Sequence, residues 1–259
     1  MCPFHYSKSV PLPRLISILI LPFLSISLLL LPLLNAGKKP IEYNLNISGT
    51  PVTIVAEEND DAEIDLIYDS LKLEKLGLKK EAFTYAYTGY KNLEKQDVFS
   101  NEGIITICDF SQSSRKKRLY LIDLNAYKLI MHTYVAHGRN SGEEYARKFS
   151  NNPESHQSSL GFYKTKKPYF GGHGLALTLS GLEKGFNDKA ERRKIVMHGS
   201  DYVGENYLRR SKYMGRSFGC PAIPEKLAKK LITAIKNGTC LFIYHPNKPY
   251  LTGSKILNG

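Results

Sequence analysis

The residues best suited to chemistry in this chain are a histidine and a cysteine that stand 22 positions apart. His198 is followed by Gly199, and Cys220 closes a short Ser-Phe-Gly-Cys segment. An imidazole that takes the proton of a thiol creates a strong nucleophile, and the resulting thioester divides acyl transfer into two easier steps. The pair therefore predicts a cysteine enzyme of acyl transfer, in which the second acceptor decides between transferase and hydrolase.

Two local elements must position this pair. We expect a short strand over residues 194–197 to deliver His198. A helix is expected to begin near Pro224, to run through residue 235 and to stop at Asn237-Gly238. Cys220 then lies directly before a helix, where backbone amides can hold a developing oxyanion. The simpler reading is that a cysteine before a proline only ends a strand.

The rest of the body reads as mainly β. Apolar runs of strand length alternate with glycine-rich or charged connections, and Asn125-Ala126 stands at the turn of an expected hairpin. We assign residues 101–259 to one catalytic domain. Its expected strands cover residues 104–110, 118–124, 128–136, 160–163, 175–179, 194–198 and 241–245.

Helical spacing of apolar residues precedes this body, over residues 61–96, with a break at Gly77. We expect a small N-terminal helical hairpin there, within a segment of linker and hairpin that covers residues 37–100. Aromatic residues at helical spacing are more often packing residues than functional ones. We therefore assign no chemistry to the tyrosines of this segment, which are Tyr85, Tyr87 and Tyr90.

The first 36 residues have the anatomy of an export signal. Lys8 and Arg14 precede an uncharged apolar run over residues 15–34, and Ala36-Gly37 suits a cleavage site. The run is nearly long enough to span a bilayer, so a retained anchor stays open beside a cleaved signal peptide. The sequence thus indicates an exported protein of the periplasm or cell envelope, with a transient membrane association through this segment as a further option.

Charge and cysteine count agree with export. The formal net charge of +12 suits an anionic wall polymer or membrane, although scattered lysines also form ordinary solvated surface, and export makes nucleic acid the least expected partner. Loss of Cys2 with the signal leaves three cysteines, which points to one free thiol in an oxidising compartment. Cys220 is the expected free thiol, while Cys108 and Cys240 are either a disulfide pair or buried hydrophobes.

The order of histidine, spacer and Ser-x-Gly-Cys resembles the signature of the L,D-transpeptidase catalytic domain (YkuD-like), in its murein L,D-transpeptidase branch. In that family the histidine precedes the cysteine, the reverse of papain-like peptidases. The resemblance runs from about residue 66 to the end and implies a β-sandwich or barrel catalytic domain. Further matching segments cover residues 135–142, 158–163 and 181–187.

By this resemblance, Cys220 attacks the carbonyl between an L-centre and a D-centre in a tetrapeptide stem of peptidoglycan, and His198 is the general base. The sequence departs from the common family pattern at position 218, where many members have a second histidine, and at Pro221-Ala222. The implied supporting residues are Gly199, whose carbonyl orients the imidazole, Ser217, which shapes the turn, and Phe218 and Gly219, whose amides join that of Cys220 in an oxyanion hole.

Substrate contacts are expected from side chains near the pair. A guanidinium can grip a carboxylate with two hydrogen bonds, which makes Arg216 the first candidate for the free carboxylate of the stem and Arg139 another. Tyr163 and His173 are further candidates for the cleft. No zinc-ligand spacing is present, so we expect neither a metal nor another cofactor.

Other functions remain open on the sequence. An L,D-carboxypeptidase would use the same thioester with water as acceptor. A cell-wall-binding protein could retain the fold without chemistry. Sortases also place histidine before cysteine, but they require an arginine after the cysteine, and none follows Cys220.

Overall fold

The computed structural model describes residues 60–172 and 174–259. The expected signal peptide or anchor over residues 1–36, the beginning of the linker and His173 therefore lie outside the described residues. Within the described ranges, no helix combines the length and apolar character needed to cross a membrane.

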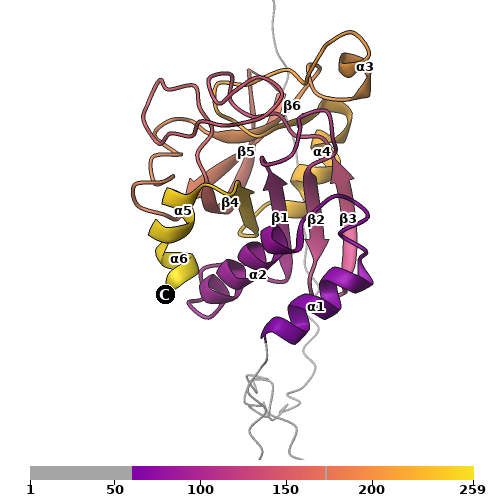
Figure 1. Cartoon of the computed structure of the whole chain (residues 1–259). Coiled ribbons are helices and arrows are strands. Elements are labelled where there is room, and N and C mark those ends of the chain that lie inside the picture. Colours follow the sequence, from indigo (N-terminus) through magenta and orange to yellow (C-terminus); the bar gives the residue numbers. More distant parts are fainter. Residues whose placement is uncertain (1–59, 173) are drawn as a thin grey trace, which may run out of the picture. The chain divides into compact units, whose positions relative to one another are not determined.

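One eight-stranded sheet forms the body of the domain (Figure 1), in the order β3-β2-β1-β8-β4-β5-β6-β7. Neighbouring strands are antiparallel except for the pairs β1/β8 and β6/β7, which are parallel. The strands are β1 Ile104–Asp109, β2 Leu119–Asp123, β3 Lys128–Thr133, β4 Gly161–Gly171, β5 Gly174–Gly181, β6 Val196–Ser200, β7 Ala222–Pro224 and β8 Cys240–Tyr244.

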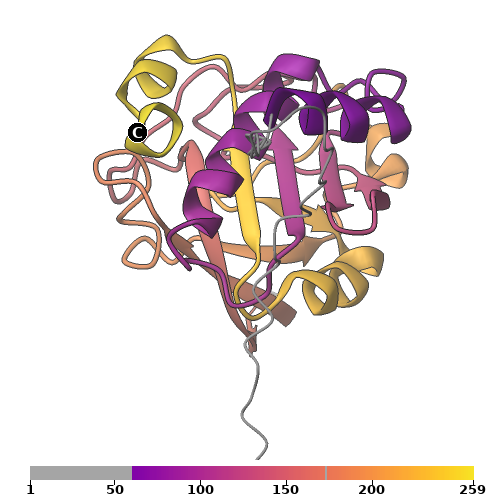
Figure 2. The same cartoon turned by 90° about the horizontal axis from the view of Figure 1, so that it is seen from below.

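The sheet curls until the chain beyond one edge strand meets the other edge. Ala136, which follows β3, forms an antiparallel bridge with Ala222 of β7, and Gly138 forms a parallel bridge with Ser217. Strands β5 and β6 run across the direction of β1 and β8 (Figure 2). The predicted mainly β, barrel-like fold with helices is confirmed.

Helices α1 (Asp60–Ser70) and α2 (Lys80–Glu94) occur where the periodicity predicted them. The chain turns between them at Gly77, whose φ of 90° favours glycine. One stripe of α2 packs toward β1 and β8 and joins the main hydrophobic core. Tyr87 and Tyr90 are buried in that stripe and Tyr85 stacks on Tyr244, so these tyrosines are packing residues as predicted.

Helix α4 (Glu225–Ile235) supports the strand that carries His198. It begins after Pro224, as predicted, and contacts β5, β6 and β7. Its backbone comes so close to β6 that a Cβ on Gly199 would lie 2.8 Å from Ala228 Cβ. A glycine after the histidine therefore lets strand and helix pack closely.

Several elements differ from the sequence prediction. Strand β4 continues to Gly171, because its lysine-rich outer half pairs with β5 around a register shift at Pro168. Strand β7 separates Cys220 from α4, so the cysteine does not lie directly before the helix. This strand is short and ends in a proline, which hides it from periodicity. The helices that were not predicted are α3 Glu205–Leu208, α5 Lys248–Gly253 and α6 Lys255–Asn258.

Cys108 and Cys240 are both buried and free. They lie on the neighbouring strands β1 and β8, but Cys240 is in register with Ile105. Three residues of strand separate Ile105 from Cys108, about 10 Å at the usual rise. That exceeds the Cα separation of a disulfide, so both cysteines act as small core hydrophobes.

Candidate active site

His198 occupies the middle of β6, between Ala176 of β5 and Ala222 of β7. Its side chain is only 5% exposed, and Nδ1 lies 2.9 Å from the carbonyl oxygen of Gly199. A carbonyl can only accept, so the neutral imidazole carries its proton on Nδ1 and presents Nε2 as the basic nitrogen. The contact that the resemblance implied for Gly199 is present.

Cys220 stands two residues before Ala222, the partner of His198 in the parallel β6/β7 ladder. Alternate residues of a strand share a face, so this register brings Cys220 to the side of the sheet that carries His198. The amide of Val196 donates to Sγ at 3.5 Å, and Sγ lies 3.8 Å from the carbonyl oxygen of Lys194. The thiol is thus held against the beginning of the histidine strand.

Burial raises the pKa of the Cys220 thiol. The hydrogen bond from Val196 and the positive charge of Arg193 lower this pKa, but burial is the larger effect. The resting sulfur is therefore protonated at neutral pH, and a thiol in this state needs a base to become a nucleophile. The neighbouring imidazole can supply that base.

Ser217 organises the turn that presents the cysteine. Its Oγ accepts the amide proton of Gly219 at 3.0 Å and donates to the carbonyl oxygen of Cys220 at 2.6 Å. Serine hydroxyls commonly bond to an amide two residues ahead, which stabilises a turn. The Gly219 amide is therefore engaged within the turn. Within the described ranges, the amides of Phe218 and Cys220 have no protein acceptor.

Gly219 has a φ of 120°, and a Cβ there would lie 2.8 Å from the carbonyl oxygen of Gln157. Both the left-handed backbone and the close approach of another chain segment require glycine at this position. The turn is consequently pressed onto the loop that contains Gln157.

The segments that carried the family resemblance meet at this turn. Ser158 Oγ accepts the amide proton of Gly138 at 3.0 Å and donates to the carbonyl oxygen of Gly219 at 3.4 Å. Ser141 Oγ in turn accepts the amide proton of Ser158 at 2.9 Å. These serines support the turn that presents Cys220, and their place in the matching segments was the only sequence signal for that role.

Arg193 is a second supporting residue that sequence reasoning did not identify as such. Its guanidinium donates to the carbonyl oxygens of Ser150 at 2.8 Å and Gln157 at 2.7 Å, and also to the hydroxyls of Ser155 and Ser159. These bonds fix the loop beneath Gly219. Its charge also reaches Cys220, where it favours the thiolate.

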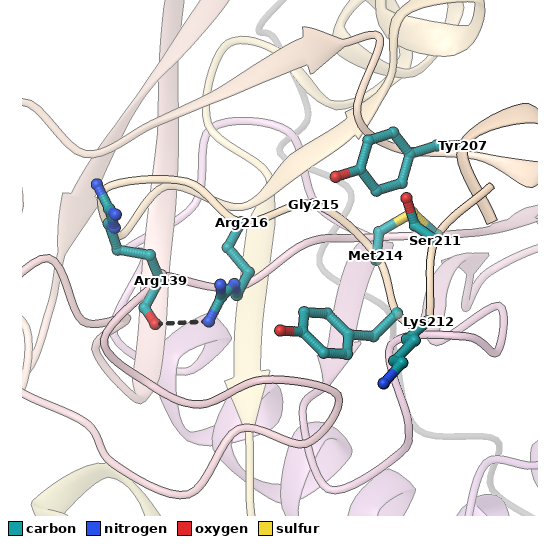
Figure 3. A pocket seen from close by; sticks show the side chains of 8 residues that line it. Arg139, Tyr207, Ser211, Lys212, Met214, Gly215 and Arg216 are labelled. Atoms are coloured by element: carbon teal, nitrogen blue, oxygen red, sulfur yellow. Dashed lines mark hydrogen bonds between the residues drawn. The ribbon is translucent and has the colours of Figure 1, made fainter.

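A basic pocket opens beside the turn, with a volume of about 420 Å³. Arg216 lies there between Arg139 and Tyr207 (Figure 3). Its Nη1 donates to the carbonyl oxygens of Arg139 at 3.3 Å and Gly142 at 3.1 Å. The lining residues are Arg139, Tyr207, Ser211, Lys212, Tyr213, Met214, Gly215 and Arg216.

Phe218 is 63% exposed. The centroid of its ring lies 4.5 Å from the centroid of the His156 ring and 5.6 Å from Cζ of Arg139. The side chain thus covers the loop beside the turn, and position 218 can contribute to oxyanion binding only through its amide.

The two tyrosines of β4 lie in different environments. Tyr163 is fully buried and its hydroxyl donates to the carbonyl oxygen of Ser159 at 3.0 Å, so the expected substrate contact of Tyr163 has no exposed surface to rest on. Tyr169 is 46% exposed and is in register with Ala176, which is in turn the partner of His198. Tyr169 is therefore the tyrosine on the side of the sheet that carries the site.

The other described histidines are dispersed in separate contacts. His137 is buried, its Nδ1 accepts from Arg118 at 2.8 Å, and burial together with that positive charge lowers its pKa to about 3. His132 bonds to the carbonyl oxygen of Lys117 and its pKa is lowered by burial. Among residues 60–172 and 174–259, no three histidine, cysteine or acidic residues group as metal ligands.

A mainly β domain with a buried histidine and a thiol on adjacent parallel segments defines a site for cysteine chemistry. The family model of the L,D-transpeptidase catalytic domain matches residues 74–244, which is more than half of the 259 residues. The chain belongs to the L,D-transpeptidase catalytic domain family. No curated protein matches it significantly.

The solved structures that match this chain include an L,D-transpeptidase from Mycobacterium smegmatis, with 9% identity over 55% of this chain and 59% of that one and a TM-score of 0.35. The helical cell shape determining protein Pgp2 from Campylobacter jejuni shares 15% identity over 57% of this chain and 50% of its own, with a TM-score of 0.36. The chain thus spans less than two thirds of these proteins, and the family assignment rests on the family model.

Proposed function

We propose that this protein is a peptidoglycan-modifying cysteine L,D-transpeptidase of the cell envelope. The observation that carries the proposal is the Cys220 thiol, which is held by Val196 and Lys194 at the beginning of the strand that bears His198. The histidine is already in the tautomer that leaves Nε2 basic. Membership of the L,D-transpeptidase family supports the choice of substrate.

The first half-reaction forms a thioester. His198 Nε2 takes the thiol proton, and Sγ of Cys220 bonds to the carbonyl carbon between the L-centre and the D-centre of a tetrapeptide stem. The amides of Phe218 and Cys220 stabilise the oxyanion, while Gly219 and Ser217 hold the turn in shape. The C–N bond then breaks, and the proton on His198 passes to the leaving amine.

The second half-reaction releases the enzyme. An amine of a neighbouring stem attacks the thioester, His198 accepts its proton, and the C–S bond breaks with return of the proton to the sulfur. If water attacks instead, the product is a tripeptide stem and the enzyme is an L,D-carboxypeptidase. The chemistry before this step is the same for both activities.

Substrate binding is assigned to the basic pocket beside the turn. Arg216 lines it, and its guanidinium group suits a stem carboxylate, whereas the guanidinium group of Arg139 points away from Arg216 (Figure 3) and lies over the Phe218 ring. The basic net charge of the chain also suits an anionic wall. Export through residues 1–36 to the periplasm or cell envelope belongs to the same proposal, since the substrate lies outside the cytoplasm.

The test is a product analysis with purified disaccharide tetrapeptides. The protein without residues 1–36 and its Cys220→Ala variant are incubated with the substrate, and the products are resolved by mass spectrometry. Dimers that require Cys220 support transpeptidation, whereas tripeptide monomers that require Cys220 support carboxypeptidation. If folded and reduced protein changes nothing, the enzyme proposal fails and a wall-binding role replaces it.

A further inference from the structure

Left-handed backbone at residues other than glycine is concentrated around the turn that presents Cys220. Among the residues that the structure describes, seven of this kind have a positive φ, and three of the seven lie in segments that touch the turn: Glu154 at 57°, His156 at 54° and Lys194 at 56°. The carbonyl oxygen of Lys194 lies 3.8 Å from Sγ of Cys220. The loop of the other two continues to Gln157, whose carbonyl oxygen faces the turn. Side chains disfavour this conformation, so it persists only where neighbouring contacts fix it.

Contacts from two other chain segments fix the backbone of His156. Nη2 of Arg193 donates to the hydroxyl of Ser155 at 3.1 Å and to the carbonyl oxygen of Gln157 at 2.7 Å, so both neighbours of the histidine are held. The carbonyl oxygen of His156 itself accepts the amide proton of Asn140 at 3.1 Å. These bonds set the direction in which the imidazole leaves the loop.

The imidazole of His156 packs against Phe218. The two ring centroids are 4.5 Å apart, and the ring planes are inclined by 31°. The guanidinium group of Arg139 contacts the same Phe218 ring, with Cζ 5.6 Å from its centroid. Because the Phe218 side chain is 63% exposed, the hydrophobic core does not fix it. The orientation of residue 218 therefore depends on these contacts with neighbouring side chains.

The orientation of residue 218 matters because its amide belongs to the proposed oxyanion site. Within the described chain, the Phe218 amide has no protein acceptor, whereas the Gly219 amide donates to Ser217 Oγ. A donor that stabilises an oxyanion must be aimed before the reaction, since its reorientation would add to the barrier. Ser217 holds the turn from within, and the ring contact holds residue 218 from the solvent side.

We propose that His156 is a positioning residue whose ring packs against Phe218 and keeps the Phe218 amide aimed at the carbonyl oxygen of the group that Cys220 attacks. This inference rests on the proposed function. The role belongs to the flat ring of His156 and requires no proton transfer. Another flat ring at position 156 should therefore preserve it, and loss of the ring should abolish it.

The first experiment compares a reaction that passes through an oxyanion with one that does not. Full-length His156→Asn is suitable, because asparagine tolerates the left-handed backbone but has no ring. Acylation of Cys220 by p-nitrophenyl acetate forms a tetrahedral oxyanion and releases p-nitrophenolate, whereas alkylation by iodoacetamide displaces iodide without an oxyanion. We expect acylation to slow about 3- to 10-fold, as for loss of an aromatic pair, and alkylation to be unchanged. Unchanged acylation, or an equal loss in both reactions, would overturn the proposal.

Two further variants separate the ring from the backbone. His156→Phe keeps a flat ring, and its acylation rate should remain within about twofold of the unchanged protein. Tyr127→Asn is the matched backbone control, since Tyr127 has a φ of 47° and an exposed ring but lies in the turn between β2 and β3. It should leave acylation unchanged. A loss in Tyr127→Asn equal to that in His156→Asn would refute the role of the ring contact.

A double-mutant cycle tests whether the two rings act through each other. Phe218→Ala should slow acylation by about the same factor as His156→Asn, and the double variant should be no slower than either single one. Each rate is divided by the folded fraction from urea denaturation. Losses that multiply in the double variant would show that His156 acts independently of Phe218 and would reject the proposal.

Turnover of disaccharide tetrapeptides separates this inference from the proposed function. A protein that p-nitrophenyl acetate acylates in a His156-dependent manner, but that leaves the stems unchanged, would retain the positioning role and reject the transpeptidase. Stem turnover that is equal in His156→Asn and the unchanged protein would retain the enzyme and reject the positioning role.

Discussion

Charged side chains have opposite environments in two regions of the domain. Buried Glu183 accepts hydrogen bonds from the amide of Phe162 at 2.7 Å, from the hydroxyl of Tyr250 at 3.0 Å and from the hydroxyl of Ser254. In the basic pocket, Arg216 and its neighbours keep donors that no described protein group accepts. A buried charge must be satisfied by the protein, whereas an accessible one is free for a ligand.

The residue type alone does not decide this difference. Arg118 is also an arginine, but it is fully buried and donates to Val135, Gln112 and His137, while burial lowers its pKa to about 10. Arg118 therefore holds chain segments together, as Glu183 does. Removal of a buried, hydrogen-bonded charged side chain is therefore expected to affect stability strongly and chemistry weakly. Removal of a side chain of the candidate site is expected to do the reverse.

The largest effect is expected at the site, from His198→Ala. Loss of a general base typically costs 10²- to 10⁴-fold in rate, and we expect a decrease of about 10³-fold in thioester formation with little change in unfolding free energy. Acylation of Cys220 followed by intact-protein mass spectrometry measures the rate. His132→Gln is the control, because His132 bonds only to a surface carbonyl among its polar contacts. An unchanged acylation rate in His198→Ala would show that His198 is not the general base.

Glu183→Ala tests the region in which a buried charge is satisfied by hydrogen bonds. It leaves three buried donors without their acceptor, and each such group costs about 1–3 kcal/mol. We expect a loss of about 3–5 kcal/mol in unfolding free energy, measured by urea denaturation, with nearly normal acylation per folded molecule. Glu191→Ala is the matched control, since its ion pair with Lys166 is exposed and is expected to contribute less than about 1 kcal/mol. Similar losses in the two variants would contradict this assignment.

Acid is expected to lower the free energy of unfolding through the buried His137. The folded pKa of about 3 lies below the ordinary 6.5, so the unfolded chain binds this proton more readily. The contribution of His137 is complete above pH 6.5 and is lost as the pH falls toward 3. Between pH 7 and pH 5 we expect a loss of about 2 kcal/mol in unfolding free energy. His137→Gln should flatten this dependence in urea titrations, and an unchanged slope would exclude His137 as its source.

The smallest effect is expected for Phe218→His. The exposed ring contacts only His156 and Arg139 among aromatic and cationic neighbours, and such contacts contribute about 1 kcal/mol or less. Because the proposed oxyanion role of position 218 uses only its backbone amide, the rate of thioester formation should change less than about threefold. A much larger change in either direction would mean that the side chain itself takes part in the site.

Much of the fold could be predicted because its signals are local. The apolar runs of β1 and β2 are buried along nearly their whole length, and α2 buries one stripe of residues at helical spacing. The outer half of β4 could not be predicted in this way, because it is exposed and carries lysines and Pro168 on a hairpin held by β5. Strand β7 is too short for a period to show.

The candidate site divides in the same manner. His198 and Cys220 are marked by their chemical types and by adjacent glycines, which sequence displays directly. The engagement of the Gly219 amide depends on the geometry of one turn. Tyr163 and Tyr169 are six residues apart, so regular alternation would place both on one face of β4. The register shift between Thr165 and Pro168 interrupts that alternation, and only the pairing with β5 reveals it.

The sequence by itself determined which reactive groups are present and predicted the kind of chemistry, since a thiol, a base and flexible glycines follow from residue types and order. Only the tertiary structure decided which charges are available. Arg139 and Arg216 are 77 positions apart, and the bridge between Gly138 and Ser217 brings them to one pocket. Arg118 and Arg193 instead donate hydrogen bonds to several backbone carbonyl groups. The physical reason is that a guanidinium bonds to whatever acceptors folding places around it, and those acceptors come from distant segments.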